Sequence, residues 1–358
     1  MAQVLTLHEN KANPVPIPHT KIVEAYGLRK CPKLVEQVAQ DVDIEIRINA
    51  LAVLCDEFNN PYSIAGCAKA GCIRILANMV VDPDYVTRDR ASKALSICAK
   101  DANGVQAILD ENVVGVILLG LKDNSDAVRT NVYECFYHLS RTSAGANACV
   151  ESKAAVIFVE AISKENDSLK SLILKCIYNL VGSDQGRQDA IAASVIEICI
   201  ELIKENKDRT LDVAIQATRT LGFICFDEDA KDKAINCDAM NVLFALLKDK
   251  TKQNNYSIDL KSTITMALMA ITSTDEGKRQ ILTCDGIDCL VSLLNEDNRV
   301  VKLNTLKLIS SAAVYPPNRL RFLQDHGCIT LLNKIKDSDD SMLKKHAKMA
   351  FESVNWTP

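Results

Sequence analysis

The chain has 358 residues, with 42 Lys and Arg against 46 Asp and Glu, and a formal net charge of −4. Nucleic-acid-binding proteins usually show a strong excess of basic residues, which this chain lacks, so we expect no nucleic-acid partner. Hydrophobic residues make up 48% of the chain, which suffices for a large core. Aromatic residues make up only 5% of the chain, beside 13 Gly and 9 Pro, and this composition suits packed helices better than β-sandwiches or β-barrels.

In the N-terminal segment 1–20, Pro14, Pro16 and Pro18 alternate with apolar residues. Proline fixes φ and cannot donate a helical hydrogen bond, so the sequence predicts an extended, polyproline-like arm. Two roles stay open for this arm, a flexible tail and a segment that docks on a partner. Met1 to Asn10 lacks the basic and apolar regions of an export signal, so we expect the chain to stay in the cytosol.

A 41-residue spacing follows the arm. The segment from Arg129 to Gly145 places a small or apolar residue three positions after the arginine, a bulky apolar residue at seven and glycine at sixteen. The same pattern recurs 41 residues earlier from Arg88 and 41 residues later from Lys170. A period of about 40 to 47 residues is typical of HEAT and armadillo arrays, in which each repeat consists of two or three helices.

Extending this spacing gives one anchor position in each repeat. The anchors are Arg47, Arg88, Arg129, Lys170, Ala214, Lys261, Lys302 and Lys344. Because nearly all of them are basic, we interpret Arg129 as part of the repeat architecture, pairing across the inter-repeat turn. Sixteen residues after an anchor we expect a turn, with a small residue or one that tolerates a left-handed backbone conformation. These turn residues are Ser63, Gly104, Gly145, Gly186, Ala230, Gly277 and Asn318.

The remaining helices follow from apolar periodicity. A small or apolar pair twenty and twenty-one residues after each anchor, such as Ile108 and Leu109, predicts a short first helix. In the third unit, apolar stripes over 113–121 and 128–139 flank a polar turn and predict the second and third helices. Neither stripe can be buried within one repeat, so neighbouring repeats must cover them. At the C-terminus, we expect a cap formed by Met349, Phe351, Val354 and Trp356.

The sequence therefore predicts an all-α fold, a right-handed superhelical solenoid of the armadillo or HEAT type with about eight repeats. The expected divisions are the arm at 1–20, an N-terminal capping repeat at 21–61, six repeats at 62–317 and a C-terminal capping repeat at 318–358.

Catalytic and metal-binding motifs are absent from the sequence. It contains no phosphate-binding loop, no nucleophile elbow and no C-x-x-C, and its five histidines are scattered over different repeats. We expect no enzyme, no cofactor, no metal and no small-molecule substrate. The 14 cysteines are interpreted as small buried hydrophobes. The uncharged stretch Ser262–Thr274 is shorter than the roughly 20 residues that span a bilayer, so we also expect no membrane partner.

Armadillo-type repeats line a groove with their third helices. In the proteins that this chain resembles, two positions of each third helix face the groove, and each position forms a column of equivalent residues along the repeats. Nuclear-import adaptors of this class carry Trp in one column and Asn four residues later. Here the first column contains no Trp, and the second contains a single Asn, Asn179, so import-signal binding is not expected. The columns instead offer basic residues and nearby amides. These candidate partner-binding residues are Lys93, Asn131, Lys175, Asn179, Arg219 and Lys307.

Such a face suits an acidic helix or extended segment, as in the cadherin-tail-binding, catenin-like proteins that the chain resembles in outline. The alternative is that these are solvated helix faces without a partner. Two repeats also carry insertions, at 204–210 and 248–257. We include Lys250 and Lys252 of the second insertion as candidate contacts, although a loop also lengthens without a function.

The opening of the first repeat resembles a narrower family. Ala25-Tyr26-Gly27, Arg29 and Lys33-Leu34, then Ala50-Leu51 and Leu54-Cys55-Asp56, are similar to the armadillo-type radial spoke protein 14 family of cilia and flagella. The closing Phe351-Glu352-Ser353-Val354 and terminal Pro358 are also similar to that family. The resemblance implies a non-catalytic structural subunit of the axonemal radial spoke. It also implies that other radial spoke proteins are its partners. The protein would reside in the axoneme, which is part of the cytoskeleton, and in the cytoplasm before assembly.

Two functions remain open at this stage. One is a scaffold built permanently into the spoke, where it supports ciliary and flagellar motility. The other is a soluble armadillo adaptor that captures an acidic segment of one partner in its groove.

Overall fold

The structure, a computed structural model, describes residues 21–22, 25–39, 42–204, 211–248 and 258–357. The predicted arm at 1–20, most of both insertions, and therefore Lys250 and Lys252, lie outside the described residues. Every regular element within the described residues is a helix, which confirms the all-α prediction. The chain divides into two compact units, 1–139 and 140–358.

The helices of the first unit follow one another with short turns. They are η1 Gly27–Arg29, α2 Lys30–Val38, α3 Ile44–Glu57, α4 Pro61–Lys69, α5 Cys72–Met79, α6 Tyr85–Cys98, α7 Ala102–Asp110, α8 Val114–Ile117, η2 Leu118–Lys122 and α9 Asp126–Ser140, whose last residue belongs to the second unit.

The second unit continues the same order. It contains α10 Ser143–Glu151, α11 Ala154–Ala161, η3 Ile162–Lys164, α12 Asp167–Leu180, α13 Asp184–Ala192, α14 Val195–Lys204, α15 Leu211–Ile224, α16 Glu228–Asn236, α17 Ala239–Lys248, α18 Ile258–Ile271, α19 Asp275–Thr283, α20 Gly286–Leu293, α21 Arg299–Ala312, α22 Pro316–Gln324, α23 His326–Lys336 and α24 Ser341–Val354.

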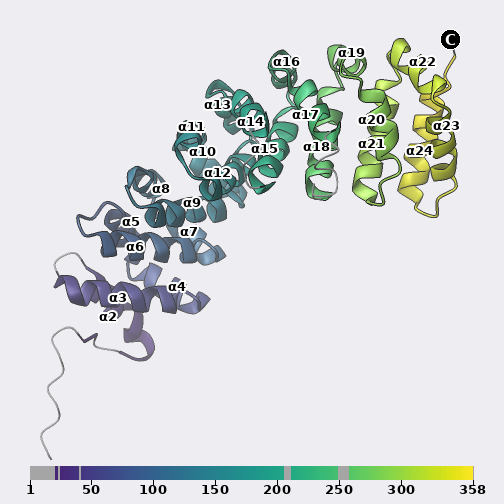
Figure 1. Ribbon diagram of the computed structural model, residues 1–358. Helices are drawn as coiled ribbons and strands as arrows, with labels where there is room; N and C mark the ends of the chain where they lie inside the picture. Colours follow the sequence, from purple (N-terminus) through teal and green to yellow (C-terminus); the bar gives the residue numbers. More distant parts are fainter. Residues whose placement is uncertain (1–20, 23–24, 40–41, 205–210, 249–257, 358) are drawn as a thin grey trace, which may run out of the picture. The chain divides into compact units, whose positions relative to one another are not determined.

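A triplet of helices recurs along both units. Its first member is always nine residues long (α4, α7, α10, α13, α16, α19 and α22), which confirms the predicted short first helix. Within the second unit the third helices α12, α15, α18, α21 and α24 pack in chain order, as Figure 1 shows. This packing of neighbours is consistent with a helical solenoid.

The expected ends of the capping repeats fall close to helix starts. The division after residue 61 lies in the first turn of α4, and the division after residue 317 lies in the first turn of α22. The division into repeats itself stays a prediction.

The predicted turn position sixteen residues after each anchor is a helical position instead. Gly104, Gly186 and Gly277 are each the third residue of a first helix. A Cβ on Gly186 would lie 2.2 Å from the carbonyl oxygen of Leu180, and one on Gly277 would lie 2.4 Å from that of Ile271. The residue at this position is small because the first helix begins against the end of the preceding third helix. A left-handed backbone conformation is not the reason.

Left-handed residues occur eight positions later, between the first and second helices. Gly71 has φ 84°, and the corresponding residues of the next five triplets also have positive φ. They are Asn112, Lys153, Ser194, Asp238 and Asp285. In each case the left-handed residue donates its backbone N–H to the carbonyl three residues earlier, for example Ser194 to Ile191 at 3.1 Å. This geometry terminates the first helix and redirects the chain into the second.

Several basic anchors link one triplet to the next. Arg47 lies 3.8 Å from Asp82, Arg88 lies 2.5 Å from Asp123, and Lys261 lies 2.6 Å from Glu296. Each acid is 35 residues beyond its anchor, in the turn before the next third helix. These three anchors therefore have an architectural role of the kind that we predicted for Arg129.

Arg129 differs from them in its contacts. Its guanidinium donates to the Asp123 carbonyl at 2.8 Å and pairs with Asp126, both in or beside the turn before its own helix.

The core consists of the predicted apolar stripes. Val128, Val132, Phe136 and Leu139 of α9 are all buried. Eleven of the 14 cysteines are buried, which agrees with their interpretation as small hydrophobes, and burial raises the pKa of the Cys149 thiol to about 12. No single helix in the part of the chain that the structure describes is long and apolar enough to cross a membrane.

The C-terminal cap is only partly as expected. Val354 is fully buried, and Lys336 covers the ring of Phe351 at 3.7 Å. In contrast, Met349 and Trp356 are 43% and 56% exposed. The prediction that these two residues cover the last interface was wrong, because both line a surface pocket, Met349 from α24 and Trp356 from the residues that follow this helix.

Candidate functional site

The predicted partner-binding residues lie in different surroundings in the first unit. Lys93 on α6 is 3.8 Å from Glu134 of α9, which also accepts a hydrogen bond from Ser96. Asn131 is buried, and its amide donates to the backbone and carboxylate oxygens of Asp89. Thus the Asn131 amide and the Lys93 charge both serve contacts between α6 and α9.

In the second unit the predicted residues occupy one side of the third helices. Lys175 on α12 lies 3.1 Å from Asp212, which partly neutralises its charge. Arg219 on α15 donates to the neutral amide oxygen of Gln216 at 3.3 Å. Within the described residues, no carboxylate pairs with Arg219 or with Lys307 of α21. Among the predicted residues of this unit that the structure describes, Arg219 and Lys307 are therefore the two cations whose charge is not paired with a carboxylate.

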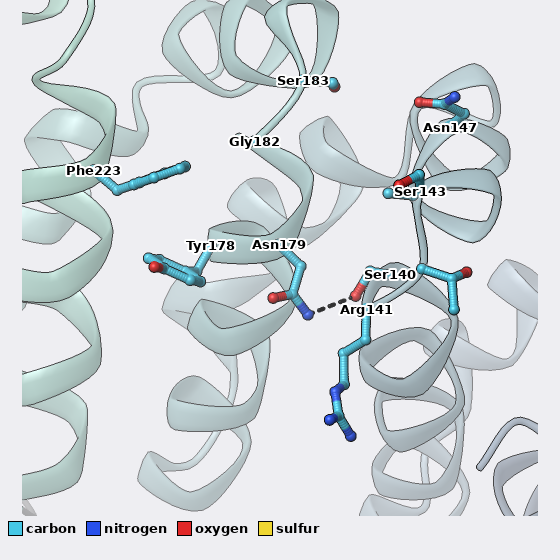
Figure 2. Close-up of a pocket in the computed structure, with 11 residues that line it drawn as sticks. Ser140, Arg141, Ser143, Asn147, Tyr178, Asn179, Gly182, Ser183 and Phe223 are labelled. Carbon is cyan, nitrogen blue, oxygen red and sulfur yellow. Dashed lines mark hydrogen bonds between the residues drawn. The ribbon is translucent and has the colours of Figure 1, made fainter. Parts of the chain in front are cut away.

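Asn179 lies in a pocket of about 520 Å³ that belongs entirely to the second unit. The pocket lies where α12 ends and where α10 and α13 begin (Figure 2). The lining residues are Ser140, Arg141, Thr142, Ser143, Ala146, Asn147, Tyr178, Asn179, Gly182, Ser183 and Phe223.

Capping residues build two walls of this pocket. The Thr142 hydroxyl accepts a hydrogen bond from the backbone N–H of Gly145 at 3.1 Å and so begins α10. Ser183 accepts from Gly186 at 3.1 Å and begins α13 in the same way. Because both helices start at the pocket, short polar side chains gather there.

Asn179 has a defined orientation within the pocket. Its side-chain amide donates to the Ser140 hydroxyl at 3.0 Å, the dashed contact in Figure 2. Ser140 itself is buried, whereas the amide of Asn147 and the hydroxyl of Ser143 lie on exposed residues. The pocket therefore offers hydrogen-bonding groups at different depths.

Aromatic rings form the opposite side. The rings of Tyr178 and Phe223 come from neighbouring third helices, and their centroids lie 5.0 Å apart at an interplanar angle of 45°. Phe226 continues the cluster, 6.0 Å from Phe223 in an edge-to-face arrangement, and is 58% exposed. A partly exposed aromatic cluster beside neutral hydrogen-bonding groups suits noncovalent binding of a partner surface.

The sequence reasoning missed Tyr178, Phe223 and Phe226 as site residues. They lie eight, nine and twelve residues after their anchors. Tyr178 and Phe223 are three and four residues after the predicted Lys175 and Arg219 on the same helices, and Phe226 follows the end of α15. A search of these positions for any aromatic residue, and not only for Trp and Asn, would have found them.

Comparisons with known proteins bear on the fold. No protein-family model matches the chain. The crystal structure of an engineered protein from the Northeast Structural Genomics Consortium is similar with a TM-score of 0.81 at 20% sequence identity, covering 92% of this chain and 79% of that chain. A second engineered protein from the same consortium has a TM-score of 0.47 at 18% identity, covering 79% of this chain and 98% of that chain. The first likeness shows a shared fold and nothing about function.

Proposed function

We propose that the protein is a non-catalytic scaffold that binds other proteins through its third-helix surface. The aromatic cluster beside the Asn179 pocket, formed by the half-buried Tyr178 and Phe223 and the exposed Phe226, carries this proposal. Aromatic side chains contribute much of the binding energy at protein interfaces because they bury a large apolar area with few rotatable bonds. The rings and amides here combine apolar area with directional hydrogen bonding.

In this proposal the fold is a right-handed array of about eight armadillo-type repeats. The recurrence of nine-residue first helices supports it, together with the left-handed residue that recurs between first and second helices. The period of about 41 residues supports it as well.

The proposed setting is the axonemal radial spoke of cilia and flagella. The protein would be a structural spoke subunit that binds other radial spoke proteins and supports motility, residing in the cytoplasm before assembly. This setting rests on the resemblance of the N-terminal segment, in particular Ala25-Tyr26-Gly27 and Leu54-Cys55-Asp56. In the structure Tyr26 is highly exposed, which leaves it accessible to a neighbouring subunit.

Fractionation of cilia tests the proposal. After detergent extraction and high-salt treatment, a spoke subunit stays with the axoneme, whereas release with the membrane and matrix fraction would contradict the spoke assignment. The variant Phe226→Ser should lower axonemal incorporation. The matched control Ile258→Ser changes an equally exposed apolar residue, on α18, and should incorporate normally.

A second candidate is the soluble armadillo adaptor for an acidic segment. The specific observation in its favour is that Arg219 and Lys307 have no carboxylate partner in the described ranges. The same fractionation separates the two functions, because an adaptor that binds transiently would leave with the soluble fraction.

A further inference from the structure

A second pocket lies between the last two third helices, α21 and α24. It has a volume of about 480 Å³ and is lined largely by apolar atoms. Val314, Met349 and Trp356 contribute exposed side chains to it, and Trp356 is the only tryptophan of the chain. Exposed large apolar side chains that converge on one concavity are typical of a binding site.

Small residues also line this pocket, and Arg319 contacts Trp356 there. The hydroxyls of Ser310 and Ser353 lie 3.0 Å apart and join α21 to α24. The guanidinium of Arg319 lies 4.8 Å from the centre of the Trp356 ring. This cation–π contact orients the indole, which reduces the entropy lost when a ligand packs against it.

Positive charge continues from the pocket along both helices. Lys307 precedes Ser310 by three residues on α21, and Lys345 precedes Met349 by four on α24. These spacings place both lysines on the pocket side of their helices. Among the described residues, no carboxylate pairs with either lysine, and the one carboxylate of the pocket lining, Glu352, is 3.9 Å from Lys348.

The positive charge of these lysines also affects the pKa of His346. Burial lowers the pKa of this imidazole, and the charges of Lys307 and Lys345 lower it further. The two lysines therefore act on the same region of space. A ligand that brings carboxylates to this region would reduce their mutual repulsion.

We propose that the α21–α24 pocket docks an acidic segment of a partner protein, with one bulky apolar side chain against Trp356 and carboxylates beside Lys307 and Lys345. This inference rests on the proposed protein-binding role but not on the assignment to the radial spoke. The concave shape favours an inserted side chain over a membrane surface, which would require apolar groups that project outward.

Trp356 fluorescence measures the docking directly. The probe is a capped synthetic peptide of Glu and Ser residues that carries one central Leu, titrated into the full chain. We expect a saturable change in the emission of Trp356. Replacing Leu by Ser in the peptide, or every Glu by Gln, should each weaken the interaction at least about tenfold. Because these changes leave the protein untouched, its folding does not affect the comparison.

Protein variants add an independent arm. The double variant Lys307→Glu/Lys345→Glu should bind the peptide at least about tenfold more weakly, whereas Lys344→Glu, a single charge reversal of the same kind at a neighbouring exposed position, should keep its affinity. No saturable response to the Leu peptide would overturn the inference. Equal binding of the Gln peptide would overturn it too, as would a response to anionic phospholipid vesicles alone. Loss of this docking together with normal axonemal retention would leave the proposed function standing.

Discussion

The guanidinium Nε of Arg88 lies 2.5 Å from a carboxylate oxygen of Asp123 and ties α6 to the turn before α9. A second nitrogen of Arg88 donates to the carbonyls of Asp82 and Pro83 at 2.9 and 3.0 Å. One side chain thus links two successive turns of the first unit.

Replacing Arg88 by Met should destabilise the first unit by about 2–3 kcal/mol, because the largely buried Asp123 carboxylate and two carbonyls lose a charged donor. Urea unfolding followed by circular dichroism measures this change. The control is Arg74→Met, which breaks the exposed ion pair with Glu111 and should cost less than about 1 kcal/mol. Equal effects of the two substitutions would contradict the architectural role of Arg88.

Ser194→Gly should stabilise the second unit by about 0.5–1 kcal/mol. Ser194 has φ 67° and is exposed, so glycine relieves the left-handed strain, although it also raises the entropy of the unfolded chain. Thermal unfolding of the variant measures the gain. Ser194→Ala is the matched control and should give none, since alanine keeps the Cβ. A lower melting temperature for the glycine variant would disprove the strain argument.

Gly186→Ala should destabilise the second unit by about 1–3 kcal/mol. Its new Cβ would meet the Leu180 carbonyl at 2.2 Å, and backbone atoms on both sides must then move. Gly115→Ala is the control in a helix where nothing lies within 4 Å of the added methyl group, and we expect it to be neutral or slightly stabilising. Differential scanning calorimetry compares the two, and tolerance of alanine at 186 would refute the close-packing explanation.

Asp340 should make stability depend on acid pH. Its carboxylate pairs with Arg299 and accepts the backbone N–H of Leu343, and these contacts lower the pKa of Asp340 from 3.8 to about 2. The unfolded chain therefore binds more protons between these values. The contribution of Asp340 is complete above about pH 4 and is lost as the pH falls through about 2.

Unfolding midpoints measured from pH 5 to pH 2 test this expectation. Asp340→Asn should flatten the decline in that window, because the amide does not titrate. Asp339→Asn alters an adjacent exposed carboxyl and should keep the wild-type slope. Identical pH profiles for wild type and Asp340→Asn would argue against the shifted pKa.

The candidate site was only partly predictable from the sequence. The anchor spacing placed Lys175, Asn179 and Arg219 on third helices, where the structure has them. It could not show that Asp212 neutralises Lys175 or that Asp89 occupies the amide of Asn131, because these partners lie 37 and 42 residues away. The alignment of one helix against the next decides such pairs.

Local pattern determined the helical class, the presence of a short first helix and most of the core, because apolar periodicity and spacing act within one repeat. The stacking of neighbouring repeats decided the contacts that form the candidate site. Only the packing of α12 against α15 brings Tyr178 within 5.0 Å of Phe223, and only the start of α13 against the end of α12 explains why Gly186 must be small. Contacts between repeats depend on how side chains of two helices interlock, and that relationship is a property of the tertiary structure.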